Sequence, residues 1–228
     1  LQKIAEYITS RYDIYYYREE MYLHEKGFEG VTWYNADRSE QNHTLGQIIF
    51  RRLGIMVKMS EQKDIYDRLI FMMDEEHDLE NDVAMPIVTK NGYVIRQDGS
   101  IELDYSVFST NVIDTLYQPD MIENEDISGF LNFITDENEQ TLNVIKFMLG
   151  HCLTTINVPQ LGYFLVGQKG ANGKSTLTEA ISRMLGANNI NSSSLEQLEE
   201  DSHKFIAASK LANMADDVDG SYIQSANM

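Results

Sequence analysis

Residues 161–186 read LGYFLVGQKGANGKSTLTEAISRMLG, and this stretch decides the fold. It begins with a short apolar run, passes through a loop with three glycines, and ends in a segment with the spacing of an amphipathic helix. Gly186 follows the last apolar position, where a glycine C-cap is expected. The pattern therefore predicts a strand, a tight loop and a helix, in that order.

The loop contains the residue types that hold a triphosphate. Glycines at 167, 170 and 173 let the backbone approach the phosphates, because no Cβ stands in the way. Lys174 is placed to reach the β- and γ-phosphates, and the Ser175 hydroxyl is placed to bind Mg²⁺. We expect this P-loop to bind ATP and Mg²⁺ through Gly167, Gly170, Ala171, Asn172, Gly173, Lys174, Ser175 and Thr176.

The first glycine departs from the usual spacing G-x-x-x-x-G-K-[ST]. That position holds Gln168, and Gly167 comes one place early, so the loop has one extra residue or uses Gly170 for its main turn. The alternative is a glycine-rich turn with no ligand. The run Asn-Gly-Lys-Ser-Thr, set between an apolar strand and an amphipathic helix, favours the P-loop interpretation.

A second group of candidate residues follows at the end of another predicted strand, KLANMADDV, residues 210–218. Asp216 and Asp217 would hold the magnesium and, with Lys174, form the catalytic set. The alternative is an ordinary acidic turn, since DDVDG is also good turn sequence. The position downstream of a P-loop favours the magnesium role.

The predicted order of elements places this α/β core after a smaller α+β region. The strand–loop–helix–helix–strand order from residue 161 onward is typical of half of a nucleotide-binding core. Asn91-Gly92 and Asp98-Gly99 predict a hairpin or meander. Other segments predict a helix followed by a Tyr-rich strand pair in residues 1–26, and helices over 44–59, 60–73, 128–134, 137–155 and 194–208.

Composition limits the classes of function. The chain has 18 basic and 36 acidic residues, a formal charge of −18, which disfavours a broad nucleic-acid-binding surface. A single cysteine, Cys152, cannot form an internal disulfide, and its apolar neighbours predict a small buried side chain. No run approaches the roughly 18 apolar residues of a membrane span, so we expect a cytoplasmic protein without membrane contact.

Two other clusters invite a functional interpretation. Tyr15, Tyr16 and Tyr17 could stack nucleic-acid bases, but such clusters more often pack in the core of a strand or helix, which is the interpretation we favour. Residues 74–82, DEEHDLEND, could bind a metal ion, but they lack EF-hand spacing and favour a solvated acidic loop.

GANGKST, with LANMADD further along, resembles the superfamily 3 helicases of phage and plasmid primase–helicases, the D5-like group. The upstream segments NGYVIRQDG, VIDTLYQPDM and ISGFLNFITDENEQTLNVIKFMLGHCLT resemble the D5 N-terminal domain of that group. The resemblance covers residues 85–228, and it is motif-specific around the P-loop. Residues 1–84 resemble the corresponding part of that group only loosely, in their position and general character.

The resemblance implies a D5-like N-terminal domain at residues 1–135 and an AAA+-like ATPase domain at 136–228, incomplete at its C-terminal end. It implies an ATP-dependent replicative DNA helicase of a phage or mobile element, acting in the bacterial host cell as a hexameric ring on single-stranded DNA. The chain starts at Leu1 and ends in SYIQSANM, so we expect a fragment. The group's sensor Asn, DNA-contacting hairpin and arginine finger would then lie beyond Met228.

Two other functions stay open at this stage. The first is another P-loop enzyme such as a small-molecule kinase, which would need a lid and a substrate pocket after the second strand. The second is a non-enzymatic interaction module with an inactive nucleotide site. ATP hydrolysis by this chain, compared with hydrolysis by the full-length protein, tests the second alternative.

Overall fold

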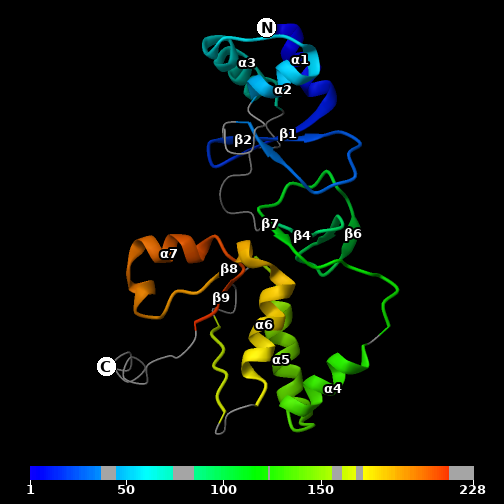
Figure 1. Ribbon diagram of the computed structural model, residues 1–228, viewed down its shortest axis with the longest axis vertical. Coiled ribbons are helices and arrows are strands. Elements are labelled where there is room, and N and C mark those ends of the chain that lie inside the picture. The colour runs from blue at the N-terminus through cyan, green and yellow to red at the C-terminus, as the bar shows by residue number, and fades with distance from the viewer. Residues whose placement is uncertain (37–44, 74–84, 123, 156–160, 168–171, 216–228) are drawn as a thin grey trace. The chain divides into compact units, whose positions relative to one another are not determined.

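The computed structural model describes residues 1–36, 45–73, 85–122, 124–155, 161–167 and 172–215 (Figure 1). Helices and small sheets alternate, so the protein is mixed α/β, as the sequence predicts at this coarse level. Internal contacts divide the chain into two compact units: Leu1–Val83 with Asp104–Phe108, and Ala84–Leu103 with Ser109–Met228. The domain ranges 1–135 and 136–228 come from the family resemblance and stay a prediction.

The first unit contains a three-stranded antiparallel sheet in the order β1-β2-β3. Arg18 and Glu19, with φ of 50° and 65°, form the two-residue turn between its first two strands. Positive φ at both turn residues matches the twist of a hairpin. The helix and strand pair predicted within residues 1–26 are confirmed. The elements are α1 (Gln2–Arg11), β1 (Tyr12–Tyr17), β2 (Glu20–Glu25), β3 (Tyr34–Asn35), α2 (Leu45–Leu53) and α3 (Met59–Met72).

The core of the first unit takes apolar side chains from its helices and its sheet. Leu23 of β2, Ile49 of α2 and Leu69 of α3 are almost wholly buried in one cluster. On β1, the ring of Tyr15 stacks on that of Phe108, with centroids 4.2 Å apart. The Tyr-rich segment is therefore a packed strand, which is the interpretation that the sequence favours.

The helix predicted over residues 44–59 is wrong in its length. α2 ends at Leu53, because Gly54 adopts a φ of 68° and its N–H donates to the Phe50 carbonyl at 2.8 Å. The helix predicted over 60–73 is confirmed as α3. Its start is fixed by Glu61, whose carboxylate accepts the Lys58 N–H at 2.8 Å.

The second unit contains a four-stranded sheet in the order β6-β5-β4-β7. Gly92 and Gly99 have φ of 88° and 83°, and they form the two turns of the predicted meander, which is confirmed. A fourth strand, which the sequence did not predict, pairs in parallel with β4. The strands are β4 (Ile87–Thr89), β5 (Tyr93–Ile95), β6 (Ile101–Leu103) and β7 (Asn111–Ile113).

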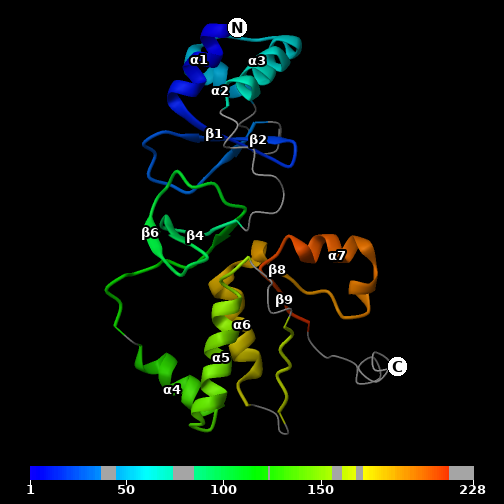
Figure 2. The same ribbon diagram turned by 180° about the vertical axis from the view of Figure 1, so that it is seen from behind.

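Three longer helices pack with this sheet in one apolar cluster. The side chains of Asn124 and Asn138 cap α4 (Glu125–Ile134) and α5 (Glu139–His151), respectively, by accepting backbone N–H groups of the first turn. The third helix, α6 (Lys174–Leu185), ends at Gly186, as the sequence predicts. Figures 1 and 2 show α5 and α6 side by side from opposite directions.

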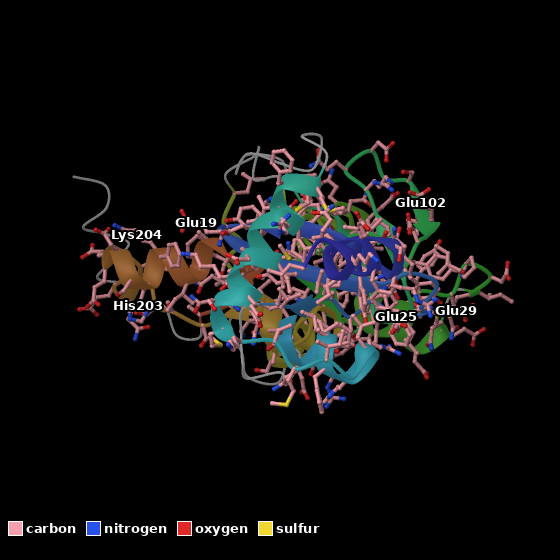
Figure 3. The ribbon with its side chains drawn as sticks, turned by 90° about the horizontal axis from the view of Figure 1, so that it is seen from above. Glu19, Glu25, Glu29, Glu102, His203 and Lys204 are labelled. Atoms are coloured by element: carbon pink, nitrogen blue, oxygen red, sulfur yellow. The ribbon has the colours of Figure 1, made fainter. Side chains whose placement is uncertain are left out.

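The predicted helix over residues 194–208 is broken. A short 3-10 turn, η4 (Gln197–Glu199), precedes α7 (Asp201–Ala208), because Glu200 between them is extended, with φ −80° and ψ 133°. His203 and Lys204 lie on different sides of α7 (Figure 3). His203 contacts the Ser193 hydroxyl at 3.0 Å, while Lys204 pairs with Asp201 on the exposed side.

A small parallel pair of strands ends the described chain. After α6, the 3-10 turn η3 (Ala187–Asn189) leads into β8 (Ile190–Asn191), which pairs with β9 (Ala212–Asn213). β9 confirms part of the strand predicted over 210–218.

The strand predicted over residues 161–167 is wrong for the described residues. The segment pairs with no described strand. The other predicted strand of this core, which contains β9, pairs with β8. Its apolar side chains stay largely exposed, with Val166 at 89%. Tyr163 is the exception, since its hydroxyl contacts His151 of α5 at 3.2 Å. Tyr163 is thus the one residue of this segment that is partly buried. The apolar run suggested a strand, but it did not show which neighbouring strand would supply the hydrogen bonds.

The end of α6 provides a stability test. Gly186 has φ 82° and ψ 150°, a region open almost only to glycine, and a Cβ there would lie 2.8 Å from Asp114 Oδ2. We predict that Gly186→Ala lowers the free energy of unfolding by about 1–3 kcal/mol. Urea denaturation followed by circular dichroism measures this change.

Gly129 supplies the matched control, because it lies within α4 and a Cβ there would meet nothing within 4 Å. Gly129→Ala should raise the free energy of unfolding by about 0.5–1 kcal/mol, since alanine loses less entropy in a helix. Equal stability of the two variants would contradict the role assigned to Gly186.

Candidate nucleotide-binding site

The structure describes part of the predicted phosphate-binding set. Gly167 and the run from Asn172 to Thr176 are described, while Gly170 and Ala171 lie outside the described residues. Asp216 and Asp217, the predicted magnesium ligands, also lie outside them, as does the acidic run at residues 74–82. The site is therefore built from the two ends of the loop and the first turn of α6.

α6 is held by an apolar row along one face. Leu177, Ile181 and Leu185 recur at four-residue spacing and are all buried in the core of the second unit. On the opposite face of the helix, Ser175 and Thr176 of the first turn are exposed. Burial of one face thus fixes the direction in which the N-terminus of the helix presents its backbone N–H groups and hydroxyls.

The N-terminus of α6 follows a glycine in the left-handed conformation. Gly173 precedes the helix with φ 82° and ψ 0°, and as a glycine it has no side chain to cap the first turn. The first N–H groups of a helix have no partner within it, and they carry the positive end of the helix dipole. An anion such as a phosphate is a suitable partner for these groups.

Lys174 lies where the two ends of the loop meet. Its ammonium group donates to Asn172 Oδ1 at 2.9 Å, and the side chain is half-buried. A Cβ on Gly167 would lie 1.7 Å from Asn172 Nδ2 and 2.9 Å from Lys174 Nζ, so only glycine permits this approach. Among the described residues, Lys174 has no carboxylate within ion-pair distance. Its charge is therefore available for an anionic ligand.

α4 forms a wall beside the loop, which the sequence did not predict. A Cβ on Gly173 would lie 2.4 Å from Ile134 Cγ2 and 3.2 Å from the Phe130 ring. The conformation of Gly173 is therefore set by packing as well as by chain geometry. The only sequence signal was the apolar spacing of Phe130 and Ile134 in α4, which predicts a buried face without naming its partner.

A surface depression lies elsewhere in the second unit. It has a volume of about 290 Å³, and none of its lining residues belongs to the predicted site. Its one charged residue, Arg96, pairs with Glu102. Since that arginine is already occupied, the depression offers less to a charged ligand than the loop at Lys174 does.

No metal-binding cluster appears in the described part of the chain: no three His, Cys, Asp or Glu side chains gather there. The exposed Ser175 hydroxyl fits the place of a magnesium ligand at the start of the helix, because hard cations bind oxygen donors. The remaining oxygen ligands would come from Asp216 and Asp217, by sequence alone. Within the described ranges, no helix is long and apolar enough to cross a membrane.

The single cysteine lies at the C-terminal end of α5, packed against the same core as α6. We predicted a buried side chain for Cys152, and it is only half-buried. Burial raises the pKa of its thiol, because the thiolate is disfavoured away from water.

We predict slow alkylation of Cys152 in the folded chain. A raised pKa leaves less thiolate at pH 8, and the thiolate is the form that reacts. Mass spectrometry after timed exposure to iodoacetamide measures the rate, and the same chain in urea serves as the control. The folded rate should lie below the unfolded rate and rise as the pH is increased from 8 to 10. Equal rates would show that the thiol is not shielded by the core.

Comparison with known proteins adds no assignment: no family model matches this chain, and no curated protein sequence matches it.

Proposed function

We propose that the chain binds ATP with Mg²⁺ at the loop between Gly167 and Lys174, as the ATPase part of a replicative DNA helicase. One observation carries the nucleotide site: Lys174 opens a helix whose preceding glycine is in the left-handed conformation, while its ammonium group lies against Gly167 and Asn172. This arrangement joins a cation held by a hydrogen bond, the N–H groups at the start of a helix and a close backbone approach, which together suit a triphosphate.

Each residue of the site has a distinct part in the proposal. Lys174 neutralises the β- and γ-phosphates, and the backbone N–H groups of the first turn of α6 orient them. The Ser175 hydroxyl and the Asp216 and Asp217 carboxylates hold Mg²⁺, which supplies charge neutralisation at the phosphates when bound. The Lys174 ammonium group has three N–H donors, so in this proposal it donates to the phosphates while it keeps its hydrogen bond to Asn172.

The helicase part of the proposal rests on the motifs that resemble the D5-like group. It assigns the protein to a phage or mobile element, with single-stranded DNA as its track and a hexameric ring as its assembly. The formal charge of −18 agrees with a chain whose DNA contacts are local or lie in other parts of the protein.

We predict that Lys174→Ala weakens binding of ATP in the presence of Mg²⁺. Loss of a charge-assisted hydrogen bond costs about 1.5–3 kcal/mol, which corresponds to roughly a ten- to hundredfold higher Kd. Isothermal titration calorimetry on the 228-residue chain measures the change. Lys146→Ala, which removes an exposed lysine of α5, is the matched control and should leave the Kd unchanged. Equal affinities for both variants would exclude the loop as the nucleotide site.

The acidic pair requires a different measurement. In the full-length protein, Asp216→Asn and Asp217→Asn should each lower ATP hydrolysis by at least about a hundredfold, because metal ligation supplies several kcal/mol of charge stabilisation. Nucleotide binding should persist in both variants, since the P-loop is intact. Steady-state phosphate release and calorimetry separate the two effects. Normal hydrolysis by both variants would show that the acids form only a turn.

A further inference from the structure

We propose that α4 is the wall on which the base of the bound nucleotide stacks, with the Phe130 ring as the contact. This inference rests on the proposed function, because it places the base of the same nucleotide whose phosphates the loop holds. It adds a substrate-contacting element upstream of the P-loop, in a helix that no motif assigns to the site.

The position of α4 is fixed by its contact with the loop. Ile134 lies directly against Gly173. A Cβ added to Gly173 would lie 2.4 Å from Ile134 Cγ2 and 3.2 Å from the Phe130 ring. Gly173 is also the residue immediately before Lys174, where the phosphates are proposed to bind. A base is separated from its phosphates by only one ribose, so an aromatic ring beside this turn is within reach of it.

The apolar surface of α4 exceeds what its packing requires. Phe130, Leu131 and Ile134 are all partly buried and pack against the core cluster of the second unit. Phe133 is 71% exposed, and Ile127 is exposed as well. A helix that keeps an exposed aromatic ring next to a half-buried one presents an apolar surface to a flat ligand.

The charge on α4 also suits a base better than a phosphate. Glu125 and Asp126 begin the helix, at the end away from Ile134 and Gly173. These carboxylates repel a phosphate but not a neutral base. The orientation therefore places phosphates at Lys174 and the base along the aromatic part of α4.

Stacking on a phenylalanine ring does not distinguish one base from another, because every base has a π-face. The wall therefore predicts similar affinities for ATP and GTP, with Kd values within about threefold of each other, and a clear preference for both over tripolyphosphate.

The test compares two ligands that share the phosphates and differ in the base. Calorimetry on the 228-residue chain measures Kd for ATP and for inorganic tripolyphosphate, each with Mg²⁺. Phe130→Ala should weaken ATP binding about tenfold, because a stacked base contributes a factor of this order. It should leave the Kd for tripolyphosphate within about twofold, because Ile134, the nearer contact of Gly173, remains in place. Phe130→Tyr keeps the ring and should retain the ATP affinity.

Two controls keep folding separate from binding. Phe147→Ala removes a ring of α5 that is 56% exposed, and it should leave both affinities unchanged. Phe133→Ala removes an exposed ring that lies outside the core cluster, so a partial loss of ATP affinity there supports the wall without a change in packing. Circular dichroism melts identify any variant that has lost its fold.

The outcomes separate the two proposals. If the wild-type chain binds both ligands and Phe130→Ala, Phe130→Tyr and Phe147→Ala all bind ATP like the wild type, the wall is overturned while the P-loop function stands. If Phe130→Ala weakens the binding of ATP and of tripolyphosphate to the same extent, the ring supports the loop and does not touch the base, and the wall is overturned. If the wild-type chain binds neither ligand, the nucleotide site itself fails, and the wall is overturned with it.

Discussion

The burial of one face of α6 is the constraint on which the second unit depends. Leu177, Ile181 and Leu185 enter a core that also contains residues of α5, β4 and β7. Gly173 and Gly186, at the two ends of the helix, both have φ of 82°, so the chain enters and leaves α6 through conformations that other residues adopt rarely. A shift of the helix along its axis would remove the apolar row from the core and move both glycines from their contacts.

The acidic charge of the chain makes a phosphate site possible only through local chemistry. With 36 acidic and 18 basic residues, the general field repels a triphosphate. Screening limits that field to about 8–10 Å at physiological salt. Within that distance, Lys174 and the N-terminus of α6 provide positive charge, and the described residues place no carboxylate in an ion pair with Lys174. Short-range geometry therefore outweighs the net charge.

The sequence predicted the elements whose signals are local. Turn glycines at 92 and 99 and the C-cap at Gly186 appear as expected, because each depends on the φ of one residue. Pairing of strands depends on distant residues, so the sequence missed β7 and wrongly predicted a strand at 161–167. The start of α6 at Lys174 follows the motif, while nucleotide binding there stays a prediction. The contact of α4 with Gly173 did not, because an apolar face indicates burial without identifying the surface that covers it.

That contact also bears on the proposed nucleotide site. A loop that must order itself on binding loses conformational entropy, about 1–2 kcal/mol for each residue that becomes fixed. Gly173 is already fixed between α4 and α6, and the Lys174–Asn172 hydrogen bond holds the lysine beside Gly167. Less ordering remains for the ligand to impose, so more of its interaction energy appears as affinity. In the proposed nucleotide site, the packing of α4 against Gly173 would therefore contribute to affinity as well as to the stability of the fold.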